Sequence, residues 1–338
     1  MAPQKASLAL ALIGLSLVSC GTVKISQKMD KVYSLKLHDQ EMTVDAANGG
    51  RILSFTYKGH DILTGKDVHR ENYGSTFWVS PQMWRWPPSP TLDVKEYQAQ
   101  IKGNTLVLTS AKDDQWGCSF VKRITPDPKV NAFSIEYEIV NTSDAIIKWA
   151  PWEVTRVPSG GTSFFEKGPE TGFNWSSLST EEKDGIVWYK WADPPRRGNP
   201  KIFSNGQGGW LAHTDGSVLY IKVFPDIDPT KAAPRENEVE IFASPIARYV
   251  ELETQGEYKT LAPGESITWT VKWVITAADA SWDEGKLLEA AKAIVSQMSD
   301  LQGFKTSKIW LRSFPHLYGK DLFLNGDFHS LMDSLLIL

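Results

Sequence analysis

Cysteine is almost absent from this chain. Cys20 and Cys118 are its two cysteines among 338 residues, and neither stands in a Cys/His spacing typical of structural zinc. Cys118 lies among apolar neighbours in the segment WGCSF (116–120), where a free thiol packs as a small hydrophobe. The cysteines therefore predict no zinc site, and they allow a disulfide only if Cys20 is free to pair.

Strong charge of one sign is also missing. The net charge is −4 and 22% of the residues are charged, so acidic and basic side chains are mixed. A nucleic-acid-binding protein would show a basic stripe, and this composition argues against that class. No glycine-rich strand-to-helix turn is present, so neither a nucleotide fold nor a cofactor is expected. The acidic runs 226–228 (DID) and 236–240 (ENEVE) lack the glycine-kinked spacing of a calcium loop. Alternating glutamates are typical of a solvated strand face, and no metal is expected.

The apolar run near the N-terminus is shorter than the roughly 20 residues of a transmembrane helix. It covers residues 6–18 behind Lys5, the arrangement of a secretory signal peptide. Residues 17–21 (LVSCG) resemble the lipobox of bacterial lipoproteins, which implies cleavage before Cys20 and a diacylglycerol on its thiol. The alternative is an ordinary signal peptide in which the cysteine falls there by chance. The lipobox implies a signal peptide over residues 1–20. It also implies an exported chain, lipid-anchored in the bacterial cell envelope on its periplasmic or outer-membrane face.

Short alternating apolar and polar runs, separated by Gly, Pro, Asn and Asp, fill residues 32–277. Residues 133–139 (FSIEYEI) alternate cleanly, which is typical of a strand with one solvated face. Strands at such close spacing indicate an all-β sandwich or barrel. One amphipathic helix is predicted near the C-terminus, where Ser281 and Glu284 form a capping box and residues 287–298 carry an apolar stripe. We expect one domain over residues 21–302 and an appendage of uncertain order over 303–338.

Tryptophan is abundant, with 14 residues, and many occur in clusters. Flat rings with an apolar face and a polar N–H suit amphipathic ligands, of which sugars are the commonest outside the cytoplasm. The alternative is a large sandwich that fills its core with tryptophan, as we expect for Trp269 and Trp273. The proline-rich loop 83–90 (MWRWPPSP) is stiff. It presents Trp84, Arg85 and Trp86 either to a ligand or as a plug at one end of the sandwich.

Several segments together resemble the galactose-mutarotase-like superfamily. They are residues 49–55 (GGRILSF), 59–63 (GHDIL), 250–255 (VELETQ), 261–265 (LAPGE) and 267–274. The resemblance implies a large antiparallel β-supersandwich, all-β apart from the C-terminal amphipathic helix, that handles carbohydrates. Within the superfamily the chain is similar to a group of exported bacterial proteins through residues 75–82 (STFWVSPQ) and 149–156 (WAPWEVTR). This finer similarity sharpens the fold and not the function.

The resemblance places Glu253 at the position of the mutarotase general base, which takes the proton of the anomeric hydroxyl. Alternation along a strand puts Tyr249, Glu251 and Glu253 on one face. Two glutamates on one face are either a functional pair or a solvated edge. Which of them faces the cleft depends on the strand register, since a slip of one residue inverts the faces.

The acid of the mutarotases is a histidine, and Trp152 falls at its place in this chain. Glu153 and His213 are the candidates to replace it, although a lone histidine at a strand end is more often only exposed. Arg156, three residues after Glu153, is a planar fork that grips carboxylates. It either holds a uronic acid or pairs with Glu153 as part of the structure.

Three hypotheses follow: a sugar-active enzyme with Glu253 as base, a non-catalytic saccharide-binding protein, and an envelope scaffold that binds a protein. A sheet face filled by the chain's own side chains would favour the scaffold. The residues expected to line a saccharide site are Trp78, Gln82, Trp84, Arg85, Trp86, Trp152, Arg156, Tyr249 and Glu251, beside the catalytic candidates Glu253, Glu153 and His213.

Overall fold

The computed structural model describes residues 23–170, 173–192 and 198–300. Cys20, the predicted signal peptide over 1–20 and the predicted appendage over 303–338 lie outside these residues. The chain divides into a first compact unit that ends at Val295 and a second that begins at Ser296.

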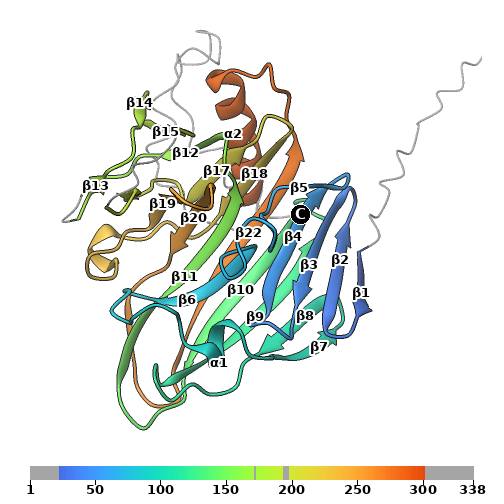
Figure 1. Cartoon of the computed structure of the whole chain (residues 1–338), viewed down its shortest axis with the longest axis vertical. Coiled ribbons are helices and arrows are strands. Elements are labelled where there is room, and N and C mark those ends of the chain that lie inside the picture. Colours follow the sequence, from blue (N-terminus) through green and yellow to red (C-terminus); the bar gives the residue numbers. More distant parts are fainter. Residues whose placement is uncertain (1–22, 171–172, 193–197, 301–338) are drawn as a thin grey trace, which may run out of the picture. The chain divides into compact units, whose positions relative to one another are not determined.

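Two large antiparallel sheets form the first unit (Figure 1). In the described part of the chain the larger sheet has 12 strands. In spatial order these are β1 (Lys24–Met29), β2 (Val32–Leu37), β3 (Gln40–Asp45), β4 (Arg51–Tyr57), β6 (Ser75–Ser80), β11 (Ile147–Pro158), β20 (Tyr249–Gln255), β19 (Val239–Ala243), β16 (Lys201–Ser204) and β13 (Trp175–Ser176), with β5 (His60–Asp61) on β4 and β21 (Lys259–Leu261) on β11.

The second sheet has 10 strands among the described residues. Its order is β14 (Glu181–Lys183), β15 (Ile186–Lys190), β12 (Thr162–Glu166), β17 (Trp210–Thr214), β18 (Val218–Val223), β22 (Ser266–Ala277), β10 (Ala132–Asn141), β9 (Cys118–Asp127), β8 (Thr105–Thr109) and β7 (Gln98–Lys102). The predicted all-β supersandwich is confirmed. The run 133–139 lies in β10, where buried and half-buried residues alternate as expected.

Helices are few in the described part of the chain. α1 (Pro90–Asp93) follows β6, a short 3-10 helix covers Pro229–Lys231, and α2 (Glu284–Asp300) is the predicted amphipathic helix. Leu287 and Ala291 of α2 are buried in an apolar cluster with strands of the second sheet. In the part of the chain that the structure describes, no helix is both long and apolar enough to cross a membrane.

The predicted capping residue of α2 is wrong. Asp283 caps the helix, because its carboxylate accepts a hydrogen bond from the backbone N–H of Lys286 at 2.9 Å. Ser281 instead belongs to the preceding turn, where its N–H and hydroxyl both donate to the carboxylate of Asp279. An acidic side chain that accepts from the first turn of a helix serves as well as the predicted serine.

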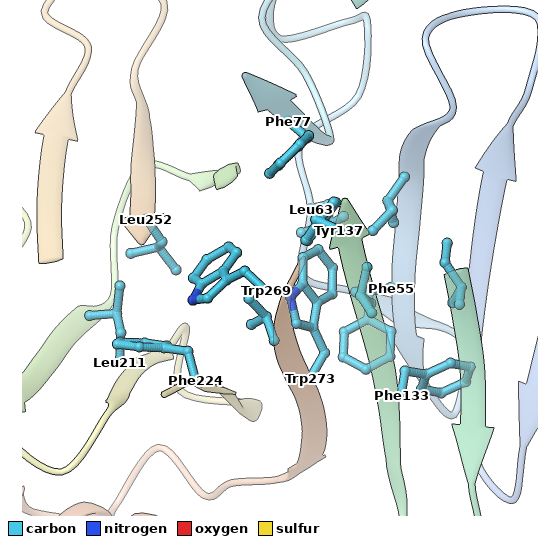
Figure 2. Close-up of a cluster of buried hydrophobic side chains, with 14 of the residues drawn as sticks. Phe55, Leu63, Phe77, Phe133, Tyr137, Leu211, Phe224, Leu252, Trp269 and Trp273 are labelled. Carbon is cyan, nitrogen blue, oxygen red and sulfur yellow. The ribbon is translucent and has the colours of Figure 1, made fainter. Parts of the chain in front are cut away.

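The apolar core fills the space between the two sheets (Figure 2). Trp269 and Trp273 of β22 are buried there, as predicted, and the ring of Phe55 from the larger sheet packs 5.5 Å from that of Trp273. Cys118 is a buried free thiol at the start of β9, also as predicted. Fully burying such side chains contributes about 1.5–3 kcal/mol each.

An ion pair crosses this apolar core. Glu153 of β11 and Lys222 of β18 are both fully buried, and their charged groups are 2.9 Å apart. Lys222 also donates to the carbonyl oxygen of Leu252 at 2.7 Å. The Tyr137 hydroxyl and the Trp273 indole N–H donate to the other oxygen of Glu153, at 2.6 and 3.1 Å. Burial lowers the pKa of Lys222, and the neighbouring Glu153 opposes that shift.

We expect Lys222→Met to destabilise the fold by about 3–5 kcal/mol, because it leaves the Glu153 carboxylate buried without a counter-charge. The double variant Glu153→Gln/Lys222→Met removes both charges and should recover part of that loss. Urea unfolding of the wild type, both single variants and the double variant measures the coupling. A double variant as unstable as the sum of the two singles would contradict this account.

Candidate functional site

One face of the larger sheet points away from the apolar core and carries polar and aromatic side chains. The register sets residues side by side along a row that crosses the sheet, because directly paired residues of neighbouring strands share a face. This row runs Thr76, Val154, Glu253, Glu240, Phe203, Trp175 on strands β6, β11, β20, β19, β16 and β13. We call this side of the sheet the polar face.

Arg156 and Glu251 form one ion pair on the polar face. The Arg156 Nε donates to Glu251 at 2.8 Å and its Nη1 to the Thr76 hydroxyl at 3.0 Å, and its guanidinium lies 5.2 Å from the ring centroid of Trp78. The Arg156 side chain is fully buried, whereas that of Glu251 is 13% exposed. Burial raises the pKa of Glu251, and the adjacent guanidinium opposes that shift.

Lys201 joins two glutamates in the centre of the polar face. Its ammonium lies 2.5 Å from Glu240 and 2.8 Å from Glu253 Oε2, and the Trp152 indole N–H donates to the same oxygen at 2.9 Å. Burial lowers the pKa of Lys201, but the two carboxylates outweigh it and hold that pKa above its usual value. Burial likewise raises the pKa of Glu240 more than Lys201 lowers it.

Tryptophans stack beside these ion pairs. Trp78 lies at their centre: its ring packs edge-on against those of Trp84, Trp86 and Trp152, with centroids 5.4 to 5.7 Å apart. The Trp78 N–H donates to Asp93 of α1 at 2.7 Å, which fixes the orientation of its ring. Trp78 and Trp152 are buried, and Trp86 is 47% exposed. The loop after β6 therefore carries one exposed ring, Trp86, which rests on the buried ring of Trp78.

The glutamates of residues 236–240 (ENEVE) belong to the same region of the sheet. The prediction that they form a solvated strand face is wrong. Glu238 and Glu240 are fully buried and Glu236 is 9% exposed. Glu236 accepts from the Gln82 N–H at 2.8 Å, and Glu238 accepts from the backbone N–H groups of Ile227 and Gly206. Glu240 contacts the Lys201 ammonium and accepts from the Gln255 side-chain amide, two partners from other strands that alternation in the sequence cannot indicate.

The predicted catalytic residues do not meet at one place. Glu253 lies on the polar face with Glu251, as alternation predicted. Glu153 points to the opposite side, into the core, and His213 is buried on β17 of the second sheet, where its Nδ1 contacts the Ser163 hydroxyl at 2.9 Å. Of the two alternatives for Arg156, the pair with Glu153 is wrong, because residues three apart on a strand face opposite sides. The roles assigned to Glu253, Glu153 and His213 stay predictions.

The predicted binding residues are more closely grouped. Trp78, Trp84, Trp86, Trp152, Arg156 and Glu251 lie on or against the polar face. Gln82 and Arg85 are exposed on the loop that carries Trp86. Tyr249 lies at the end of β20, where its hydroxyl accepts from Asn72 at 3.1 Å.

Sequence reasoning missed Lys201, Glu240, Asp93 and His69. The ring of His69 packs 5.9 Å from that of Tyr249, so a histidine does stand at the border of the polar face. Lys201 follows Pro200 in a segment without clear alternation, and Asp93 belongs to a single turn of helix. No local pattern marks Lys201 or Asp93, since their partners Glu253 and Trp78 are 52 and 15 residues away along the chain.

No protein-family model matches the chain, and no curated protein matches it in sequence. Solved structures with similar folds exist. A galactose mutarotase related enzyme from Lactobacillus acidophilus is 9% identical, with a TM-score of 0.52 over 73% of this chain and 98% of that one. A galactose mutarotase-like protein from Lactobacillus casei is 10% identical, with a TM-score of 0.50 over 72% of this chain and 100% of that one.

A TPR-domain containing protein from Parabacteroides distasonis is 15% identical, with a TM-score of 0.51, and the match covers 72% of this chain and 47% of that one. At these identities the likenesses show a shared fold. The resemblance to galactose mutarotase-like proteins that the sequence predicted is therefore confirmed at the level of the fold.

Burial lowers the pKa of His213 to about 4. An unfolded histidine has a pKa near 6.5, so between pH 6.5 and 4 the unfolded chain binds a proton that the folded chain does not. The free energy of unfolding should therefore fall by about 3 kcal/mol from this residue as the pH drops from 7 to 4. Urea unfolding at both pH values should show a smaller loss in His213→Asn. The exposed His38 serves as the matched control, and a His213→Asn variant as acid-sensitive as His38→Asn would refute this assignment.

Proposed function

We propose that this chain, which has the fold of galactose mutarotase-like proteins, binds a saccharide at the border of its polar face and does not transform it. The observation that carries the proposal is Trp86, whose indole is 47% exposed and rests edge-on against Trp78. Arg85 and Gln82 are exposed on the same loop. A flat ring beside hydrogen-bonding groups fits the apolar face and the hydroxyls of a pyranose.

The Trp86 loop is held in place before any ligand arrives. The Gln82 N–H donates to Glu236 at 2.8 Å, and the Trp84 indole donates to the Val79 carbonyl oxygen at 3.0 Å. Pro87, Pro88 and Pro90 restrict the backbone after Trp86. A binding loop ordered in advance loses less entropy when it binds, which favours affinity.

Burial of the candidate acids and bases favours binding over epimerisation. The exposed fractions are 1% for Glu253, 0% for Glu153 and 1% for His213. A general acid or base acts within hydrogen-bond reach of the reacting proton, and solvent does not reach these groups here. Glu253 is also engaged within the protein, because the Trp152 indole N–H and the Lys201 ammonium both donate to its oxygen Oε2.

His69 does not restore the missing pair. It packs against Tyr249, which is four residues from Glu253 on β20. Four residues of strand extend roughly 13 Å, so His69 lies beside the opposite end of β20 from Glu253. The function we propose is therefore that of a saccharide receptor and not of a mutarotase.

We extend the proposal to the place where binding occurs. The lipobox-like residues 17–21 support an exported chain anchored through lipid at Cys20, on the sequence alone. A receptor anchored there would meet glycan outside the cytoplasm. Mass spectrometry of the detergent-extracted protein tests the anchor, since an acylated Cys20 gives an N-terminal peptide with a diacylglycerol mass.

A scaffold that binds a protein is the second candidate. The observation that favours it is the polar face itself, whose charged groups contact one another and are buried, as in the pairs Arg156–Glu251 and Lys201–Glu253. A saccharide screen without any hit would move this candidate to the front.

We expect neutral sugars, uronic acids or polysaccharide fragments to raise the thermal midpoint of the purified full-length protein in a concentration-dependent way. Trp86→Ala should abolish the shift by a monosaccharide or disaccharide, because it removes the exposed stacking surface. Ile246→Ala is the control, since Ile246 is 91% exposed between β19 and β20 and lies outside the segments that carry the exposed tryptophans. Equal loss in both variants would argue against a binding site at Trp86.

Binding without turnover makes a second prediction. NMR of a freshly dissolved aldose hit should show the same rate of anomer exchange with and without protein. Glu253→Gln should leave the affinity within about twofold, since Glu253 is not exposed to the ligand. Protein-accelerated anomer exchange that is lost in Glu253→Gln would identify the chain as an enzyme after all.

A further inference from the structure

A second exposed tryptophan lies at the opposite end of the polar face. Trp175 of β13 is 43% exposed, and its ring packs 6.0 Å from that of Phe203 on β16. It pairs directly with Phe203, which pairs with Glu240, which pairs with Glu253. The register therefore puts Trp175 on the same side of the sheet as Trp78, against which Trp86 packs.

The spacing between these two rings exceeds the size of one sugar. Six strands lie in the order β6-β11-β20-β19-β16-β13. Five spacings of about 4.8 Å separate the outer two, so Thr76 on β6 and Trp175 on β13 lie roughly 24 Å apart along the sheet. Trp86 packs against Trp78, which lies on the same face of β6 two residues after Thr76. A monosaccharide reaches one ring only. A ligand that contacts both must be a chain of several sugar units.

The same short segment fixes both tryptophans. Glu236 accepts from the Gln82 N–H of the loop that carries Trp86. The adjacent Asn237 donates through its side-chain amide to the carbonyl oxygen of Phe173, two residues before Trp175. Glu236 is 9% and Asn237 3% exposed, so neither contact is a loose surface contact. Two neighbouring residues thus hydrogen-bond to both segments that carry the exposed tryptophans.

We propose that Trp86 and Trp175 are the two ends of one binding surface for an extended saccharide chain. The inference rests on the proposed function and adds its ligand class, an oligosaccharide long enough to span the sheet. Once one end of such a chain binds at Trp86, the other end is confined near Trp175. The second contact is then intramolecular and raises the affinity without any change at the first.

The test is the dependence of affinity on chain length. Isothermal titration calorimetry of the purified full-length protein uses size-fractionated oligosaccharides of starch, cellulose, xylan and pectin, from the disaccharide upward. For the series that binds, we expect a nearly constant affinity for short chains and a rise of roughly tenfold or more once the chain spans both rings. Trp175→Ala should remove the rise and keep the short-chain affinity.

Ile246→Ala is the control, because Ile246 is 91% exposed between β19 and β20 and lies outside both tryptophan-bearing segments. It should keep both the short-chain affinity and the rise. An affinity that stays independent of length from the disaccharide to the longest chains would overturn the extended surface and leave the proposed function in place. A rise that persists in Trp175→Ala would do the same. Failure of every series to bind would overturn the proposed function itself.

Discussion

Every buried charge in this fold needs a partner, and that constraint organises both sides of the larger sheet. Glu153 and Lys222 meet in the apolar space between the sheets, with the Tyr137 hydroxyl and the Trp273 indole as further donors. An unpaired carboxylate there would cost several kcal/mol. The pair therefore ties β11 to β18 in one arrangement. A slip of one residue in β11 would turn Glu153 outward and break every one of these contacts.

The outward residues of β11 follow from the same register. Once Glu153 points inward, Trp152 and Arg156 point to the polar face, where they meet Glu253 and Glu251 of β20. Lys201 then supplies the counter-charge for Glu253 and Glu240. These charged groups thus pair with one another, and all of them are buried except Glu251, which is 13% exposed. The side chains that remain exposed to a ligand are the tryptophans at the border of the polar face, Trp86 and Trp175, and not the buried carboxylates.

The fold of this chain and the contacts of its Glu253 have to be considered separately. The chain shares its sheets with galactose mutarotase-like proteins at about 10% identity, and fold alone does not determine function. The strand that resembles the one bearing the mutarotase base is present. Its glutamate, however, pairs with a lysine and a tryptophan inside the protein. A rigid face of this kind supports binding loops at its border, as scaffolds do in many folds.

Apart from the supersandwich fold, which the family resemblance implied, the sequence by itself determined the strands, the amphipathic helix, the core positions of Trp269, Trp273 and Cys118, and the all-β class. These features follow from the period of the apolar residues and from turn residues, which act over a few neighbours. Only the tertiary structure decided that Glu238 and Glu240 are buried, that Arg156 pairs with Glu251 and that Lys201 reaches Glu253. Each of these depends on partners brought together across strands. Whether a charged side chain is solvated or paired is set by that long-range environment, and no local pattern encodes it.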